Sequence, residues 1–223
     1  MLELGNEVSP ETSGTLGRHP KQERSRQRVR SILETTRTLM KEGGAAVPTT
    51  NAIAERAGIP VGSIYQYFPN KGSIVAALYE EYLADIRQVV RDAIDADDDS
   101  LPVEDRLVYL LNQIQSAEQA GDMQIAFERA FAVSDELSKL DDLHQEQLVR
   151  MVTEYLKAMG SPMRKPKLSR LCMMTYEVSA ASWRYREAAA PPEKEYLDWQ
   201  MTVIKSLLWK AFPSRDTGDW VSV

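Results

Sequence analysis

The stretch that decides the fold is residues 49–71, which read TTNAIAERAGIPVGSIYQYFPNK. It predicts a first short helix after Thr49, whose hydroxyl can cap the free amides of the first turn. Gly58 ends this helix, because glycine readily takes the positive φ that such a turn commonly requires. A second short helix is expected from Pro60 to Phe68. Two short helices around a turn of three or four residues predict a helix-turn-helix.

The side chains of this stretch divide into an apolar face and a polar face. The apolar face comprises Ile53, Ala54, Ala57, Ile59, Ile64 and Phe68. The other positions of the second helix are Gly62, Ser63, Tyr65, Gln66 and Tyr67. Small residues permit close approach to a major groove, where serine and glutamine side chains reach base edges. Tyrosine hydroxyls and Lys71 suit phosphates. The alternative, that both tyrosines are packing aromatics, stays open.

Helical spacing continues on both sides of this stretch. Before it, apolar residues recur from Val29 to Met40, and Gly43-Gly44 ends that helix. After it, a long helix is expected from Gly72. Its inward residues would be Ile74, Val75, Leu78, Tyr82, Ile86, Val89 and Val90.

The remainder of the chain predicts four or five further helices. The acidic run 95–100 is expected to be a loop that is too acidic to pack. A weak break is expected near Ser138, and the last two helices at about 166–187 and 192–212. No stretch alternates Val, Ile and Thr as strands do. The fold is therefore predicted to be all-α, with about nine helices.

Domain boundaries follow from composition and from these helices. Residues 1–20 are rich in Gly, Pro, Ser and Thr and poor in apolar residues, which predicts a disordered tail. Residues 21–72 form the expected three-helix helix-turn-helix domain, residues 73–213 a helical body, and residues 214–223 a second tail.

Charge is distributed unevenly along the 223 residues. The whole chain has a formal net charge of −6. Residues 16–72, however, hold ten Lys and Arg against four Asp and Glu, whereas residues 73–223 hold 17 basic and 26 acidic residues. A basic segment on an acidic body favours contact between one end of the molecule and a polyanion. A solvated, charged helix start would give the same pattern.

The sequence from about Arg28 to Leu78 resembles the TetR family of bacterial regulators. RVRSILETTRTLMKEGG is similar to that family's first helix, TTNAIAERAG to its second helix and turn, and GSIYQYFPNK to its recognition helix and the start of its fourth helix. The resemblance implies phosphate contacts by Thr49, Tyr65, Tyr67 and Lys71, and base-edge contacts by Val61, Gly62, Ser63 and Gln66. Two further phosphate contacts are expected from the residues themselves, one from the hydroxyl of Thr50 and one from Arg28 in the basic segment. Arg28 would alternatively belong to a solvated helix start.

The sequence departs from the family pattern at two positions. Pro60 stands where the family usually has a small hydroxyl residue, so a phosphate contact is lost there. Val61 stands at a position that is often polar, so an apolar contact, such as one with a thymine methyl, replaces a hydrogen bond. Base preference therefore cannot be copied from relatives.

The resemblance also implies that residues 73–213 bind a small hydrophobic effector and form a homodimer. The effector candidates are Phe127, Phe131, Met174 and Trp183, all of which could instead fill a core. The dimer candidates on the last two helices are Leu171, Val178, Ile204, Leu207 and Leu208. The expected function is a repressor that binds an inverted-repeat operator in double-stranded DNA and that the effector releases.

Other functional classes find less support in the sequence. No run is long and apolar enough to span a membrane, and the first twenty residues do not resemble a secretory signal. The single cysteine, Cys172, fits a reducing compartment, so a cytoplasmic protein is expected. His144, near Asp141, Asp142 and Glu146, is interpreted as a helix-surface histidine, and no metal or cofactor is expected. The sequence shows neither a nucleophile-base set nor a phosphate loop, so an enzyme finds no support in it. An architectural DNA-binding protein would not need the large body.

Overall fold

The fold was analysed in a computed structural model that describes residues 20–43, 46–120, 127, 135–188 and 194–213. Within these ranges the chain forms eight helices and no strand, as the sequence predicted. The helices are α1 (Pro20–Glu42), α2 (Thr50–Ala57), α3 (Val61–Tyr65), α4 (Lys71–Asp95), α5 (Val103–Ala120), α7 (Asp135–Ala158), α8 (Lys165–Ala188) and α9 (Lys194–Trp209). The two tails predicted at the ends of the chain lie outside the described residues, except that Pro20 begins α1.

Local sequence signals set the helix ends near the helix-turn-helix. Thr49 caps α2, and Gly58 ends it in the left-handed region with a φ of 64°. Asn70 caps α4, because its side chain accepts a 2.9 Å hydrogen bond from the amide of Ser73, whose hydroxyl in turn lies near the Asn70 amide. Farther along, Gly160 follows α7 with a φ of 91°. Such a φ favours glycine, which explains why the chain turns at these places.

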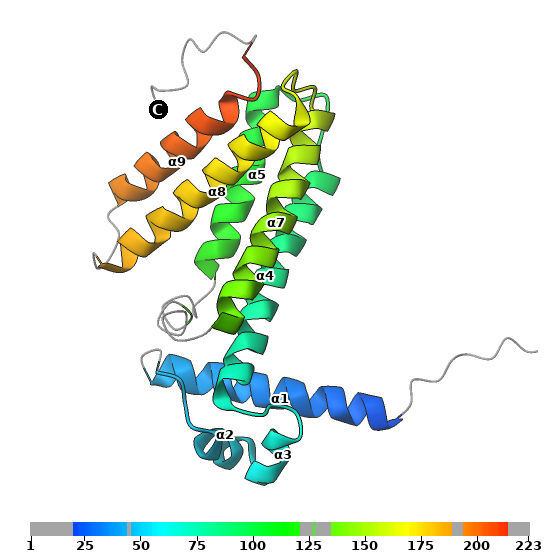
Figure 1. The fold of residues 1–223 in the computed structure, drawn as a ribbon, viewed down its shortest axis with the longest axis vertical. Helices are drawn as coiled ribbons and strands as arrows, with labels where there is room; N and C mark the ends of the chain where they lie inside the picture. Colours follow the sequence, from blue (N-terminus) through cyan, green and yellow to red (C-terminus); the bar gives the residue numbers. More distant parts are fainter. Residues whose placement is uncertain (1–19, 44–45, 121–126, 128–134, 189–193, 214–223) are drawn as a thin grey trace, which may run out of the picture.

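Two hydrophobic cores lie along the long axis of the molecule. The first joins α1, α2, α3 and the N-terminal half of α4, around Ile32, Ile53 and Ile64. The second joins the C-terminal part of α4 to α5, α7, α8 and α9, around Val90 and Leu156. Figure 1 shows α4 running from the α1–α3 end of the molecule into the helical bundle. Because α4 contributes residues to both cores, a shift of this helix would change the packing in both of them.

Several local expectations were wrong. Ser138 does not interrupt α7, which is continuous from Asp135 to Ala158. Most of the acidic run is a loop after α4, as expected, but one of its residues does pack: Asp97 accepts hydrogen bonds from Arg106 at 2.8 Å and from the hydroxyl of Tyr155 at 2.7 Å. These donors hold the pKa of the Asp97 carboxyl below its usual range, against the opposing effect of desolvation.

His144 also differs from its expected position on the helix surface. It is 3% exposed, and its Nδ1 lies 3.1 Å from Nη1 of Arg87 on α4. Burial, and secondarily the positive charge of Arg87, lowers the pKa of His144 to about 4. A partner that lies 57 residues away in the chain therefore accounts for the buried position.

Candidate functional site

The helix-turn-helix presents α3 on the surface of the molecule. Val61, Gly62, Tyr65 and Gln66 are exposed, and Ser63 is partly exposed. By contrast, Ile64 is fully buried and fixes α3 against the core. The short helix thus turns one apolar residue inward and leaves its small and polar residues accessible.

A hydrogen bond between hydroxyls joins α2 to α3. The Tyr65 hydroxyl lies 3.1 Å from Oγ1 of Thr50, while 52% of the Tyr65 surface remains exposed. Thr49, also exposed, accepts a hydrogen bond from the amide of Ala52 at 3.2 Å. Both threonines therefore have structural partners, and each keeps a hydroxyl oxygen near the same surface. This arrangement fits a group of phosphate ligands whose side chains are oriented before binding.

Gly62 has no internal packing reason to be glycine. A Cβ built on it would meet no atom within 4 Å, and its φ is not in the left-handed region. Glycine inside a helix costs about 0.5–1 kcal/mol relative to alanine. An external molecule that approaches α3 closely would explain the missing side chain.

The remaining residues predicted to contact DNA lie around α3. Lys71, exposed, is the first residue of α4, and Tyr67 is partly buried against the first core. Arg28 is exposed on α1. Two ion pairs hold the unit together: Arg56 with Glu42 at 2.6 Å between α2 and α1, and Arg37 with Glu81 at 3.0 Å between α1 and α4. None of the ten residues predicted to contact DNA is buried.

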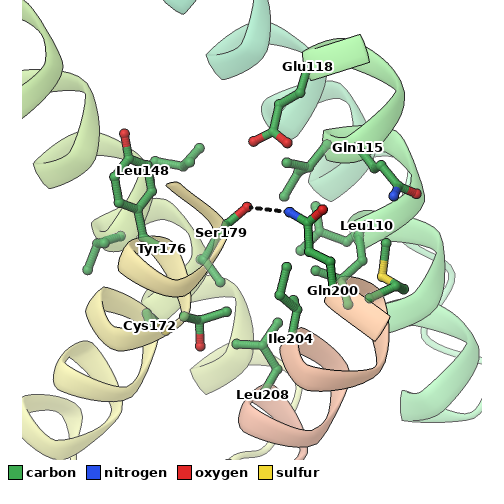
Figure 2. Close-up of a pocket in the computed structure, with 16 residues that line it drawn as sticks. Leu110, Gln115, Glu118, Leu148, Cys172, Tyr176, Ser179, Gln200, Ile204 and Leu208 are labelled. Atoms are coloured by element: carbon green, nitrogen blue, oxygen red, sulfur yellow. Dashed lines mark hydrogen bonds between the residues drawn. The ribbon is translucent and has the colours of Figure 1, made fainter. Parts of the chain in front are cut away.

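A cavity opens among α5, α7, α8 and α9 at the other end of the molecule (Figure 2). The space between these helices is about 710 Å³ when the open solvent at its mouth is counted, and about 80 Å³ of it is room for the centres of water-sized molecules. Its walls are mostly apolar, with Leu110, Leu148, Ile204 and Leu208 among them. The polar residues that line it are Gln115, Glu118, Thr175, Tyr176, Ser179 and Gln200. An apolar cavity with a few polar groups is typical of a small-molecule site.

The comparisons with known proteins decide the family. Residues 32–78 match the model described as bacterial regulatory proteins, tetR family. The chain is 26% identical over 185 residues to the HTH-type transcriptional repressor KstR of Mycobacterium tuberculosis, and the match covers 82% of each chain. The helix-turn-helix region of this chain, residues 32–78, is that of a TetR-family regulator. TetR-family proteins are DNA-binding transcriptional regulators and not enzymes.

Solved structures of TetR-family proteins share the fold. A TetR-family regulator from Streptomyces coelicolor has a TM-score of 0.60 at 20% identity, covering 83% of this chain and 99% of that one. FadR from Bacillus subtilis, solved in complex with stearoyl-CoA, has a TM-score of 0.53 at 15% identity, covering 80% of this chain and 97% of that one.

Two of the four effector residues predicted from the sequence, Phe127 and Met174, are described by the structure, and neither lines the cavity. Phe127 is buried in the first core, with its ring 5.0 Å from that of Tyr79 and 5.7 Å from that of Tyr82. Met174 is 54% exposed on α8 and points away from the bundle interior. Phe131 and the side chain of Trp183 lie outside the described residues. The prediction rested on large aromatic and methionine side chains. The type of a side chain does not show whether its side of the helix faces a cavity.

A different signal in the sequence pointed to the cavity. Gln200, Ile204 and Leu208 are spaced by four, so they share one face of α9, and Gln200 is the polar member of that otherwise apolar row. On α5, Leu111, Gln115 and Glu118 repeat the pattern. A polar residue in an inward apolar row is therefore one sequence signal of this site, beside Tyr176 and Met201, which also line it.

Two of the residues predicted for dimerisation are internal. Ile204 and Leu208 are buried in the second core and line the cavity. Leu171, Val178 and Leu207 are partly exposed. Among the described side chains of α8 and α9, the large apolar ones that are exposed are instead Met174, Trp199 and Val203. The candidate dimer face therefore turns away from the cavity.

A buried polar cluster connects the cavity wall to α4. Tyr176 lines the cavity, and its hydroxyl lies 3.5 Å from Oδ1 of Asp141 on α7. The Tyr79 hydroxyl on α4 donates to the same oxygen at 2.7 Å. Desolvation raises the pKa of both tyrosines and of Asp141. Beside this cluster, Arg87 of α4 pairs with Glu80 at 2.6 Å.

The described part of the chain contains neither a helix that could span a membrane nor a group of three side chains that could bind a metal ion. None of its helices combines the length and the apolar character that crossing a membrane needs. Nor does it bring together three His, Cys, Asp or Glu side chains that could hold a metal ion.

Proposed function

We propose that this TetR-family protein is a cytoplasmic repressor that binds an inverted-repeat operator as a homodimer and is released by a small apolar effector. The observation that carries the proposal is the position of α4. This helix starts at the exposed Lys71 beside α3. Its Tyr79 donates a hydrogen bond to Asp141, and Asp141 also lies within hydrogen-bond distance of Tyr176 in the cavity wall. We place the boundary between the DNA-binding and effector-binding domains near residue 72, so α4 belongs to the second domain and touches both.

At the operator, α3 would enter the major groove. Ser63 and Gln66 would then meet base edges through hydrogen bonds, and Val61 would supply an apolar contact. Phosphates on either side would be held by Lys71, by the tyrosine hydroxyls and by the threonines that begin α2. Arg28 would add a basic residue on α1. The exposure of these residues supports this assignment.

The homodimer would form through α8 and α9. Figure 1 shows these helices side by side at one edge of the bundle, with α4 on the other side of α7 and α5. Trp199 is 60% exposed there, one turn before the exposed Val203. Exposed apolar residues that cluster on a surface mark an interaction site. A second copy of the chain is the occupant that the operator geometry requires, because one helix-turn-helix reads too few base pairs.

Release by an effector would act through α4. A ligand changes DNA affinity only if it binds one arrangement of the protein better than another. Tyr176 in the cavity wall and Tyr79 on α4 share Asp141, so a ligand that displaces Tyr176 changes the environment of α4. The stearoyl-CoA complex of the structural neighbour FadR supports a small-molecule effector in this fold.

Selection of DNA fragments by the purified protein tests the proposed function. Bound fragments are sequenced after several rounds from a random pool at fixed salt concentration. An enriched inverted repeat, with half-site centres about 10 base pairs apart or at a multiple of that spacing, is expected. Enrichment of no motif would contradict the proposal, and enrichment of a single half-site would contradict the homodimer.

A further inference from the structure

We propose that the cavity binds a neutral amphiphile, an apolar molecule that carries one hydroxyl group, and that the carbonyl oxygen of Gln200 accepts the hydrogen bond from this hydroxyl. The inference deepens the proposed function, because it names the chemical class of the effector and the residue that selects it.

The first support is a polar group that the protein leaves unsatisfied. Gln200 is 8% exposed, and its amide nitrogen donates a 3.5 Å hydrogen bond to Oγ of Ser179. Its Oε1 has no partner among the described residues. A buried acceptor without a donor costs free energy, and most such groups in folded proteins are satisfied. A ligand hydroxyl would supply the missing donor.

The position of Gln200 within the cavity defines where the hydroxyl lies. Figure 2 shows Gln200 and Ser179 facing each other, with Gln115 and Glu118 on one side and with Ile204 and Leu208 on the other. The polar residues come from the C-terminal parts of α5 and α8 and from the N-terminal half of α9. The cavity therefore has a polar end and an apolar end, and Gln200 lies between them.

Glu118 determines the charge of the ligand. Its carboxylate lines the polar end, where desolvation, the charge of Asp141 and then the charge of Glu118 raise the pKa of the Tyr176 hydroxyl. An ionised carboxylate accepts hydrogen bonds and donates none, so it also favours a donor on the ligand. The same negative charge opposes a carboxylate ligand in a partly desolvated site. Both groups therefore favour a neutral donor over an anion.

The apolar end accommodates the body of the ligand. Leu110, Val152 and Leu208 line it, and all three are buried in the second core. Burial of apolar ligand surface stabilises the complex in proportion to the area buried and has no directional requirement. The apolar end therefore supplies affinity, while Gln200 distinguishes between ligands of equal size.

Three probes of nearly equal size test the proposal by calorimetric titration of the full chain without DNA. They are 1-octanol, its isomer heptyl methyl ether, which accepts but does not donate a hydrogen bond, and octanoate. 1-Octanol is expected to bind about 10-fold more tightly than the ether, because only the alcohol satisfies the Gln200 carbonyl. Octanoate is expected to bind more weakly than 1-octanol.

Two variants test whether Gln200 causes the preference for 1-octanol over the ether. In Gln200→Leu, the preference for 1-octanol over the ether is expected to fall to the smaller part that Glu118 supplies, because the Gln200 acceptor is gone. In the matched control Ile204→Val, one helical turn away on the same face, both affinities are expected to fall together and the preference to stay. Circular dichroism and the thermal midpoint of each variant verify that it is folded.

Several results would overturn the proposal. Equal affinity of the unaltered protein for the alcohol and the ether, tighter binding of octanoate, or binding of none of the three probes would exclude the ligand class. An alcohol preference that is undiminished in Gln200→Leu would exclude Gln200 as its source. Because these titrations contain no DNA, they fail independently of the operator selection that tests the proposed function.

Discussion

The hydroxyl of Tyr79 on α4 donates a 2.7 Å hydrogen bond to the carboxylate of Asp141 on α7. The two residues are 62 positions apart, and Tyr79 is buried. Tyr176, in the cavity wall, reaches the same carboxylate oxygen. The helix that leads to the DNA-binding surface and the wall of the cavity thus share one acceptor.

Tyr79→Phe is expected to weaken the coupling between the cavity and DNA. In the unaltered protein, saturating operator should reduce the affinity for an effector by the factor by which the effector reduces operator affinity, typically about 5–150-fold. Without the Tyr79 hydroxyl this factor should fall towards one. The measurement is titration of 1-octanol with and without the selected operator. Tyr109→Phe, an exposed position on α5, is the control, and equal factors in both variants would remove Tyr79 from the pathway.

Stability is expected to fall with acidification because of His144. Burial lowers the pKa of His144 to about 4, whereas its pKa in the unfolded chain is about 6.5. Between these values the unfolded chain binds a proton that the folded chain does not. The free energy of unfolding should therefore decrease as the pH falls from about 6.5 to 4, by up to about 1.4 kcal/mol per pH unit.

Urea denaturation of the unaltered protein and of His144→Asn, at pH 7 and at pH 5, measures this contribution. Asparagine retains an acceptor for Arg87 but does not titrate. Carboxylates titrate in both proteins, so the difference between them isolates His144. If both proteins lose the same stability on acidification, His144 is not neutral in the folded state.

Lys71→Ala is expected to weaken DNA binding similarly for all sequences, because Lys71 would contact a phosphate. The slope of log affinity against log salt should decrease by about 1. Substitution of Ser63 or Gln66 should instead change the selected base pairs, at about 1–3 kcal/mol for a preferred pair. Fluorescence anisotropy over a salt series measures the first effect, and repeated fragment selection the second. An unchanged salt slope would exclude the phosphate contact.

The fold was largely predictable because its signals are local. Thr49 and Gly58 set the two ends of α2 through their own hydrogen bonds and backbone preferences. The inward residues of α4 were mostly correct as well, although Tyr79 and Leu83 were missed and Tyr82 and Val89 are only partly buried. A helical period identifies the buried face but not its edges.

The cavity and the polar cluster were not predictable because they depend on packing between distant helices. Met174 and Ile204 are both apolar residues on amphipathic helices, yet one is exposed and the other lines the cavity. His144 has acidic neighbours in sequence, but its partner comes from α4. Only the way α4, α7 and α8 pack together distinguishes these positions.

Gly62→Ala separates stability from DNA binding. A methyl group at this position meets no atom of the chain within 4 Å, so folding should gain about 0.5–1 kcal/mol from the better helix former. The same methyl group would stand between α3 and the groove, so operator affinity should fall. Thermal denaturation and anisotropy on one preparation measure both. A variant that binds the operator as tightly as the unaltered protein would show that DNA does not approach Gly62.

Trp199→Glu combined with Val203→Glu is expected to produce monomers that lose specific DNA binding. A charge on each exposed turn of α9 would have to be buried without a partner in the dimer, whereas in the monomer it stays in water. A two-fold dimer is needed because its recognition helices must reach successive major-groove faces roughly 34–36 Å apart. Sedimentation velocity measures the assembly. The control is Tyr109→Glu, an equally drastic change at an exposed aromatic residue of α5, which should remain dimeric. If the α9 variant stays dimeric, or if the α5 variant dissociates, the interface does not lie on α8 and α9.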